Sequence, residues 1–350
     1  MGMHYIYING FKCFEEEKFS LNKITVLTGS NGAGKSSVIQ SILLHRYIED
    51  ELNNKAKQLI IPLNGYCALQ LGSFNEICNT FKDEIVLDVD SRKYRILQGD
   101  KPDYIRIENL SPTEISNNQQ ISYLNAERKG PKMSYKLHPG VKESCGVNGE
   151  YAASILFEAS TTMRKIDKAR SFSDTNYLTI EVDKWMSYIC SDVSIKTEKS
   201  NDLCFIKLRS CGPFVTAPNT GFGFIYALPI VINGLIAPEN SLMIVENPEA
   251  HLHPKAQSNI GFFLGKMAGL GIQIIVETHS EHVINGIRRA ALCGDELCHN
   301  DVNIYFFDRN IPKQPKTLIT IDHEGNLSDF PIDFFDQVRQ DMLELINLSK

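Results

Sequence analysis

The sequence lacks several features that mark specialised classes of protein. No stretch reaches the ~18 consecutive apolar residues of a transmembrane helix, so we expect no membrane span. The N-terminus has no basic segment followed by an apolar run, and we therefore expect no secretion signal. No heptad pattern persists through the middle of the chain, which argues against a long coiled coil.

A strong positive charge is also missing. The 350 residues carry a formal net charge of −6, which argues against a protein that coats nucleic acid along its whole surface. One local basic stretch exists at residues 163–170, which includes Arg164 and Lys165. A solvated helix face explains this stretch more simply than a DNA contact, and DNA binding stays an open alternative.

The nine cysteines form no recognisable disulfide or metal framework. They are scattered through a chain that is too large to need disulfides for stability, so we expect reduced thiols and a cytoplasmic location. Cys293, Cys298 and His299 are close in sequence, but no second CxxC or HxxxH pair accompanies them. A zinc site is therefore disfavoured.

Short apolar runs alternate with helical patterns at both ends of the chain. Residues 24–28 are β-branched and apolar and predict a buried strand, and apolar residues at helical spacing follow from residue 36. Nearer the C-terminus the patterns predict helices at 222–237, 254–268 and 281–291 and strands at 242–245, 273–277 and 302–307. This alternation predicts an α/β fold with a mostly parallel central sheet.

We expect one domain over the whole chain, with a core formed by residues 1–50 and 215–310. Residues 50–215 mix strand-like runs with polar, turn-rich segments, which predicts an irregular α+β insertion. The finer expectations are a loop at 111–120, a strand at 177–182 and a C-terminal amphipathic helix at 333–349, with Phe335, Val338, Met342, Leu345 and Ile346 on one face.

The clearest chemical signal is G-S-N-G-A-G-K-S at residues 29–36, which matches GxxxxGK[ST] between a predicted strand and a predicted helix. Glycines allow the backbone N–H groups to point at phosphate oxygens, and the helix N-terminus favours an anion. Lys35 would reach the β- and γ-phosphates, and the Ser36 hydroxyl would bind Mg²⁺. The predicted nucleotide-binding residues are Ser30, Asn31, Gly32, Ala33, Gly34, Lys35, Ser36 and Ser37.

Two further strands end in polar side chains. The strand at 242–245 is followed by Glu246, at the sheet edge where open α/β sheets bind ligands, so Glu246 is a candidate Mg²⁺ ligand. The strand at 273–277 is followed by His279, which could bind the γ-phosphate or the attacking water.

A glycine-containing corner opens the helix predicted at 222–237. It reads N-T-G-F-G, and its members are Asn219, Thr220, Gly221 and Gly223. Glycines at the start of a helix can form a second anion-binding corner, although a plain structural helix cap is the competing interpretation.

These four elements, taken in their order along the chain, resemble the ABC-type ATPases, and most closely the soluble RecF, SMC and OLD-like branches. The resemblance assigns residues 29–37 to the Walker A motif, Glu246 to the end of Walker B and His279 to the switch histidine. It places Thr220 where the signature motif usually has Ser. It also implies that Lys12, in I-N-G-F-K-C-F, lies near the phosphates.

Weaker elements of the resemblance concern Gln70 and two histidines. Gln70 is a candidate Q-loop residue, which would bind Mg²⁺, and His251 and His253 fall at the D-loop. More narrowly, the pieces Y-L-N-A-E-R-K-G-P and V-E-T-H-S-E-H resemble a bacterial group of stand-alone "AAA family" ATPases of phage-defence operons. The PtuA-type ATPases of Septu defence are relatives of this kind.

One departure from the family pattern affects catalysis. ABC-type ATPases usually have Asp-Glu-Pro after the Walker B strand, but this chain has Glu246, Asn247, Pro248 and Glu249. Asn247 falls where the general base is expected, and an amide cannot accept a proton as a carboxylate does. Hydrolysis is then slow, or Glu249 or His251 takes over the role. Asn247 can still orient a water molecule.

The resemblance implies a homodimer that closes around ATP and Mg²⁺, with the signature helix supplied by the second chain. It also implies control of a separately encoded nuclease or other effector in antiviral defence. The alternatives are a DNA-repair clamp of the RecF or SMC kind and a non-hydrolysing ATP-dependent scaffold. A transporter subunit is disfavoured by the E-T-H-S and H-L-H-P motifs and the irregular middle region.

Overall fold

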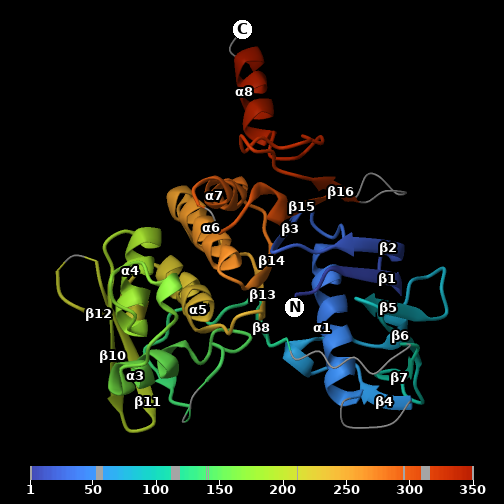
Figure 1. Ribbon diagram of the computed structural model, residues 1–350, viewed down its shortest axis with the longest axis horizontal. Coiled ribbons are helices and arrows are strands. Elements are labelled where there is room, and N and C mark those ends of the chain that lie inside the picture. The colour runs from blue at the N-terminus through green and yellow to red at the C-terminus, as the bar shows by residue number, and fades with distance from the viewer. Residues whose placement is uncertain are drawn as a thin grey trace.

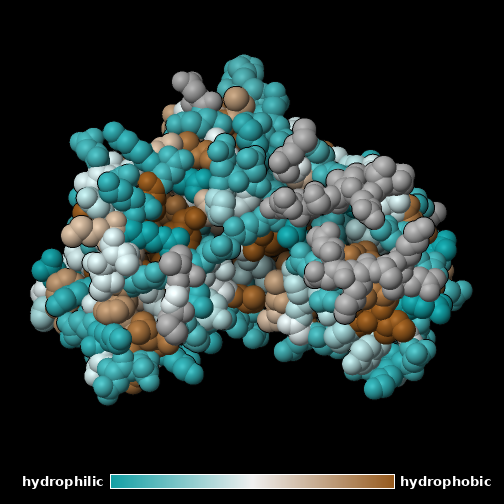
Figure 2. All heavy atoms as spheres, turned by 60° about the horizontal axis from the view of Figure 1, so that its bottom comes forward, coloured by the Kyte–Doolittle hydropathy of each residue, from teal (hydrophilic) through white to brown (hydrophobic). Residues whose placement is uncertain are grey.

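The computed structural model describes residues 2–52, 58–111, 119–138, 140, 142–210, 212–294, 296–308 and 316–348. Most of the loop predicted at 111–120 therefore lies outside the described residues. Figure 1 shows two lobes on either side of a central sheet, and the surface is hollowed between them in Figure 2.

The central sheet has six strands and carries the motifs found in the sequence. Its order is β16 (Lys316–Ile319), β15 (Val302–Phe307), β3 (Ile24–Gly29), β14 (Gln273–Glu277), β13 (Leu242–Glu246) and β8 (Ile121–Leu124). All neighbours pair in parallel except β16, which is antiparallel to β15. The predicted α/β fold with a mostly parallel sheet is confirmed.

A second sheet is antiparallel and forms the lobe on the right of Figure 1. Its order is β2 (Phe14–Ser20), β1 (Tyr5–Phe11), β5 (Ile85–Val89), β6 (Arg92–Gln98), β7 (Tyr104–Asn109) and β4 (Gln58–Pro62). Helix α1 (Lys35–Leu52) shares one hydrophobic core with this sheet and with one face of the central sheet. Residues 58–109, part of the region expected to be inserted, thus complete a sheet begun by the N-terminus.

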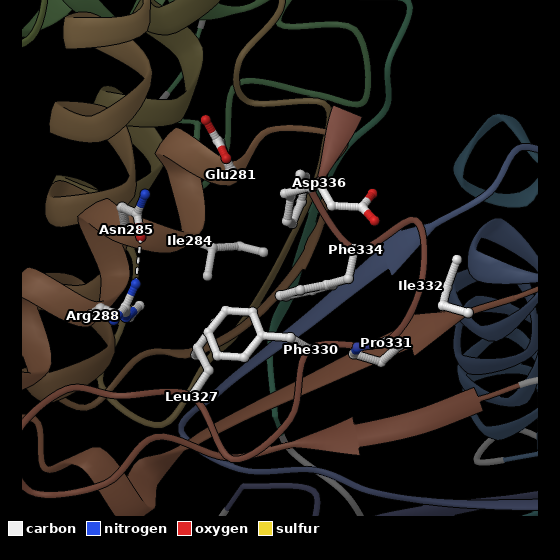
Figure 3. Close-up of a pocket in the computed structure, with 11 residues that line it drawn as sticks. Glu281, Ile284, Asn285, Arg288, Leu327, Phe330, Pro331, Ile332, Phe334 and Asp336 are labelled. Atoms are coloured by element: carbon white, nitrogen blue, oxygen red, sulfur yellow. Dashed lines mark hydrogen bonds between the residues drawn. The ribbon is translucent and has the colours of Figure 1, made fainter. Parts of the chain in front are cut away.

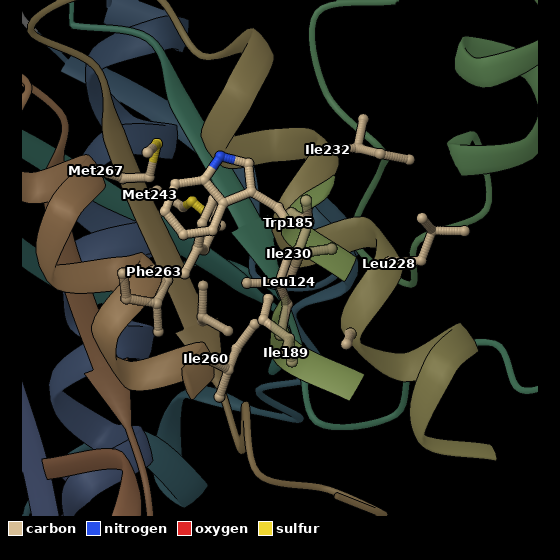
Figure 4. Close-up of a cluster of buried hydrophobic side chains, with 14 of the residues drawn as sticks. Leu124, Trp185, Ile189, Leu228, Ile230, Ile232, Met243, Ile260, Phe263 and Met267 are labelled. Atoms are coloured by element: carbon tan, nitrogen blue, oxygen red, sulfur yellow. The ribbon is translucent and has the colours of Figure 1, made fainter. Parts of the chain in front are cut away.

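Alternate residues of the central strands point into a second core on the opposite face, because successive strand residues face opposite sides. Leu242 and Ile244 of β13 lie in the core that contains α1, whereas Met243 and Val245 lie in the other. The second core includes side chains from α4 (Leu178–Cys190), α5 (Phe222–Ile236) and α6 (Pro254–Gly269), with Trp185 against Phe263 (Figure 4). Helices α1 and α5 therefore lie on opposite faces of the central sheet.

The remaining elements fill the second lobe and the connections. A small sheet contains β9 (Tyr135–Lys136), β10 (Ser194–Ser200), β11 (Leu203–Arg209) and β12 (Val215–Thr216). The other helices are α2 (Phe74–Ile77), α3 (Ala152–Thr162), α7 (Glu281–Leu292) and α8 (Gln337–Leu348), with short 3₁₀ turns at Tyr66–Ala68, Lys168–Arg170, Ala217–Asn219 and His299–Asp301.

The strand expected at 177–182 is wrong, because this segment begins helix α4. Six residues are too few to distinguish the two periodicities. Over the full helix, the buried side chains recur at helical spacing, at Leu178, Val182, Trp185 and Ile189.

The expected C-terminal helix is present as α8 and projects from the body of the molecule at the top of Figure 1. It begins at Gln337, so the expectation that Phe335 lies on its apolar face is wrong, and Phe335 has a left-handed backbone with φ of +55°. The apolar residues of α8 are exposed, with 59% of Met342 and 61% of Leu345 accessible to solvent. None of the described helices is long and apolar enough to cross a membrane.

Candidate functional site

The phosphate loop connects β3 to α1, and two of its glycines are required by close packing. Gly29 and Gly34 have φ angles of +123° and +110°, which residues other than glycine rarely adopt. A Cβ atom on Gly29 would lie 2.1 Å from the carbonyl oxygen of Phe307, and one on Gly34 would lie 2.8 Å from Cys13 Sγ. The glycines allow the curled backbone that the sequence motif predicts.

Lys35 is the first residue of α1, and its ammonium group lies against the loop itself. Nζ donates to the carbonyl oxygens of Gly29 at 3.0 Å and Ser30 at 2.8 Å, and only 4% of the residue is exposed. Burial lowers the pKa of Lys35, and the neighbouring Glu277 opposes this shift. A bound triphosphate would offer this ammonium stronger, charged acceptors than two carbonyl groups.

Ser36 contacts an acid whose role the sequence analysis missed. Its Oγ donates to Oε1 of Glu277 at 3.0 Å. Glu277 is the last residue of β14, the strand that pairs directly with β3, and only 6% of it is exposed. Burial and the nearby Glu246 raise the pKa of Glu277 to about 7. The available signal was an acid directly before the T-H-S motif, at the end of a fully apolar strand.

Glu246, which the resemblance assigns to Walker B, lies one strand further from the phosphate loop. It is paired with Glu277 in the register of β13 and β14. Both of its carboxylate oxygens accept hydrogen bonds: Oε1 from Tyr123 Oη at 2.9 Å, and Oε2 from the Ala126 N–H at 3.1 Å. Burial raises the pKa of Glu246, although these hydrogen bonds and Arg128 oppose the shift.

Asn247, in the position expected for a general base, has a left-handed backbone with φ of +44°. Its N–H donates to the carbonyl oxygen of Glu277 at 2.8 Å, and its carbonyl accepts from Arg128. The side-chain Oδ1 is buried and has no hydrogen-bond partner among the described residues. Asparagine suits this backbone because its short polar side chain tolerates the left-handed region better than most.

Glu249 is hydrogen-bonded to the residues that follow β14. Its carboxylate accepts from Thr278 Oγ1 at 2.8 Å and from the N–H of His279 at 2.7 Å. His279 is exposed as a whole residue, and partial desolvation of its ring together with the Lys35 charge lowers its pKa. The structure therefore brings His279 close to the phosphate loop and uses Glu249 to hold that backbone.

The two D-loop histidines have different surroundings. The ring of His251 packs against Tyr226 and Phe222 of α5, with centroid distances of 4.6 Å and 5.5 Å. His253 caps α6 through Nδ1, which accepts from the N–H of Lys255 at 3.4 Å. His251 thus connects the end of β13 to the helix that follows the signature corner.

The signature corner itself is formed by a 3₁₀ turn and the start of α5. Thr220 Oγ1 donates to the Ala217 carbonyl at 2.7 Å, and Asn219 Nδ2 donates to Thr216 Oγ1 at 3.2 Å. Gly221 is the exposed N-cap of α5. A Cβ on Gly223 would lie 2.6 Å from the carbonyl oxygen of His251, so this glycine permits the contact between helix and loop.

Lys12 lies in the turn between β1 and β2, beside the start of α1. Its Nζ donates to Oε1 of Gln40 at 2.6 Å, and burial lowers its pKa. The next residue, Cys13, is the one that closely approaches Gly34. Gln70 is exposed and follows a 3₁₀ turn. Tyr66 of this turn donates a hydrogen bond to Asp50 in the last turn of α1. The role of Gln70 as a metal ligand stays a prediction.

The residues present fit an ATP-bound magnesium ion but not a metal held by protein alone. Within the described ranges, no group of three or more His, Cys, Asp or Glu side chains could hold a metal ion. The buried Oε2 of Glu277 has no hydrogen-bond partner among those residues, and Ser36 Oγ lies beside the same carboxylate. Mg²⁺ favours this combination of one or two protein oxygens with substrate phosphates.

A pocket of about 440 Å³ lies elsewhere, between α7 and residues 327–336. In Figure 3 Phe330, Phe334 and Ile284 surround it, and Arg288 binds Asn285 at 2.7 Å. None of the predicted nucleotide-site residues lines this pocket.

Two family models match the parts of the chain that carry these motifs. A model described as "AAA domain" matches residues 5–168, and one described as "AAA ATPase domain" matches residues 155–284. Each of these two models covers less than half of the chain, and together they span the predicted phosphate loop, Glu246 and His279. A third model, which describes a protein family of unknown function called DUF3696, matches residues 297–345. No curated protein matches the sequence significantly.

Solved SMC heads are similar in fold. The SMC head bound to the C-winged helix domain of ScpA is 12% identical with a TM-score of 0.52, covering 91% of this chain and 98% of that chain. The SMC head domain from Thermotoga maritima is 13% identical, with 92% and 100% covered and a TM-score of 0.42. The Pyrococcus furiosus SMC head, bound to the C-terminal domain of ScpA, is 11% identical, with both chains fully covered and a TM-score of 0.49.

Proposed function

We propose that this protein is an ATPase, which binds ATP with Mg²⁺ at residues 29–37 and hydrolyses it. The observation that carries the proposal is the convergence of Lys35, Ser36, Glu277 and His279 at one edge of the central sheet. Lys35 and the first N–H groups of α1 bind the phosphates, since the first four N–H groups of a helix have no partner within it. Magnesium, when bound, would neutralise phosphate charge, and Ser36 with the neighbouring acid Glu277 would hold it.

Two copies of the chain are required for a complete site. The phosphate loop precedes α1, and the signature corner precedes α5, on the opposite face of the central sheet. The signature corner and the phosphate loop of one chain therefore begin helices on different faces of the sheet, and in our proposal the signature corner serves the ATP of a second chain. The family resemblance implies the same arrangement, an ATP-linked homodimer.

Hydrolysis is slow in this proposal. Asn247 supplies an amide where a carboxylate is expected, and Glu249 is already hydrogen-bonded to Thr278 and His279. His251 faces the aromatic side chains of α5. The buried Oδ1 of Asn247 and the His279 ring are the groups that would orient water. The amide of Asn247 in place of a carboxylate also favours a second candidate function, a non-hydrolysing ATP-dependent switch.

The biological role rests on the resemblance described above. It predicts control of a separately encoded nuclease or other effector in antiviral defence. The alternative is a clamp of the RecF or SMC kind that acts on DNA, and the SMC-head fold supports it. DNA-stimulated ATP turnover would favour the clamp.

A mixing experiment tests the ATP site and the dimer together. Lys35→Ala removes the phosphate contact, and Gly221→Arg blocks the exposed signature corner without a steric clash, because a Cβ there meets only ordinary contacts with Phe224. Each variant alone should lose ATP turnover. Equal mixing gives about half heterodimers with one intact site of two, so about a quarter of the original turnover should return.

Titration calorimetry with ATP and Mg²⁺ should show binding by the unaltered protein and its loss in Lys35→Ala. Unchanged ATP binding in Lys35→Ala would remove the site assignment. If the unaltered protein binds ATP but does not hydrolyse it, the non-hydrolysing switch is the correct function and the ATPase proposal is wrong. If the mixed variants regain nothing while the unaltered protein turns over ATP, the dimer proposal is wrong.

A further inference from the structure

Among the acids at the sheet edge, Glu277 has the surroundings of a residue that serves a bound cation. We propose that Glu277, rather than the Walker B acid Glu246, is the carboxylate that fixes the divalent cation of the nucleotide beside Ser36. This inference rests on the proposed ATP site and concerns only which chain residue serves the cation there.

The first argument is strand order. β14 lies between β3 and β13, so the end of β14 is adjacent to the phosphate loop and the end of β13 is one strand further away. Neighbouring strands are separated by about 4.8 Å. Glu277 therefore reaches Ser36 directly, and the observed contact is 3.0 Å between Oγ and Oε1.

The second argument is the availability of carboxylate oxygens. Glu277 is 6% exposed, and its Oε2 has no hydrogen-bond partner among the described residues. A buried carboxylate oxygen without a partner is costly unless a cation or donor satisfies it. Both oxygens of Glu246, in contrast, already accept hydrogen bonds, from Tyr123 and Ala126.

The third argument concerns Ser36. A hydroxyl group has one donor and two acceptor lone pairs. Because Ser36 donates its proton to Glu277, its lone pairs are left free for a cation on the phosphate side. Glu277 thus orients the serine ligand and offers its second oxygen, directly or through water. Glu246 instead holds the segment that follows β8 in place through Tyr123 and Ala126.

The test measures cation affinity without turnover. Mn²⁺ is titrated into the protein with a non-hydrolysable ATP analogue, and free Mn²⁺ is followed by electron paramagnetic resonance. Groups that orient a metal ligand typically change metal affinity about 10–100-fold, so Glu277→Gln should weaken Mn²⁺ binding by that factor. Glu246→Gln should leave it close to that of the unaltered protein.

Further variants separate the cation role from a role in folding. Nucleotide affinity in EDTA and the thermal midpoint should be retained in Glu277→Gln. Glu277→Asp keeps the negative charge, but its shorter side chain moves the carboxylate away from Ser36. This variant serves as the test if Glu277→Gln does not fold. Ser36→Ala and the double variant Ser36→Ala/Glu277→Gln should weaken Mn²⁺ to a similar degree, because the two residues act as one unit.

The outcomes are distinct. Strong weakening by Glu246→Gln with little effect of the Glu277 variants would overturn the inference and leave the ATP site intact. The reference measurement is Mn²⁺ binding by the nucleotide analogue alone. If adding the unaltered protein does not change this binding, the protein does not hold the nucleotide with its cation, and the proposed function itself fails.

Discussion

The guanidinium of Arg128 donates from Nη2 to the carbonyl oxygen of Asn247 at 2.6 Å. Its Nη1 donates to the carbonyl of Glu246, also at 2.6 Å, and to that of Asn125. Burial lowers the pKa of Arg128 to about 10, so it stays charged at neutral pH. The guanidinium also lies over the ring of Tyr226 on α5, 5.6 Å from its centroid. One side chain therefore connects the end of Walker B to the helix of the signature corner.

Arg128→Met should destabilise the fold by roughly 3 kcal/mol, because it leaves buried carbonyl groups without donors. Arg128→Lys should destabilise the fold less than Arg128→Met does, because an ammonium group can still donate to some of these carbonyl groups, although it cannot reproduce the planar guanidinium. Chemical denaturation measures both changes. A loss below about 0.5 kcal/mol in Arg128→Met, the range of ordinary surface changes, would show that these hydrogen bonds do not hold the loop.

A double-mutant cycle with Tyr226→Leu should give a coupling of about 1 kcal/mol between Arg128 and Tyr226, typical of a partly buried cation–π pair. Strict additivity of the two single changes would contradict an energetic link between Walker B and α5.

Gly34→Ala should destabilise the protein and abolish ATP binding. Its Cβ would lie 2.8 Å from Cys13 Sγ and 2.9 Å from Phe14 Cζ, so the loop must shift. Gly65→Ala is the matched control, because Gly65 has nearly the same φ, +111°, but no atom within 4 Å of the new Cβ. It should cost only the backbone strain of about 1–2 kcal/mol. Equal losses in both variants, measured by thermal unfolding, would refute the steric argument.

Gly223→Ala should weaken the contact between the signature helix and the D-loop, because its Cβ would lie 2.6 Å from the His251 carbonyl oxygen. Gly221→Ala is the control from the same corner. Its φ is −65°, and its nearest contact would be an ordinary 3.6 Å to Phe224. We expect ATP-dependent dimerisation, followed by light scattering, to survive Gly221→Ala and to be lost in Gly223→Ala. Dimerisation by both variants would contradict the prediction.

His45 should make the fold sensitive to acid. This α1 residue is fully buried, its Nε2 donates to the Arg92 carbonyl, and burial lowers its pKa to about 3. A lowered pKa in the folded state means that the stabilising contribution is complete above the unfolded value of about 6.5 and is lost as pH falls toward 3. The nearby Arg92 is paired with Glu49 at 2.7 Å and further disfavours a second positive charge.

The free energy of unfolding should therefore fall by up to about 1.4 kcal/mol per pH unit between pH 6 and pH 4 from this one group. His45→Gln retains a donor for the Arg92 carbonyl but does not titrate, so its slope should be shallower by that amount. Urea denaturation at several pH values measures the difference. Parallel slopes for the two proteins would show that His45 is not the acid-sensitive group.

The sequence alone determined the phosphate loop, since its glycines, lysine and serine are contiguous and their chemistry is local. It also predicted four of the six central strands and the helices between them, because apolar runs and helical spacing indicate burial. The other two strands, β8 and β16, were not predicted. The strand prediction at 177–182 was wrong because six residues are too few to show a period, whereas the buried residues of the full helix recur at helical spacing.

Tertiary structure alone decided which acid meets Ser36. Glu246 and Glu277 look equivalent in sequence, as each ends an apolar strand. Only the order of strands, with β14 between β3 and β13, places Glu277 beside Ser36 and leaves Glu246 to Tyr123 and Ala126. Strand order depends on how the helices pack against both faces of the sheet, and that information is spread over the whole chain rather than held in any motif.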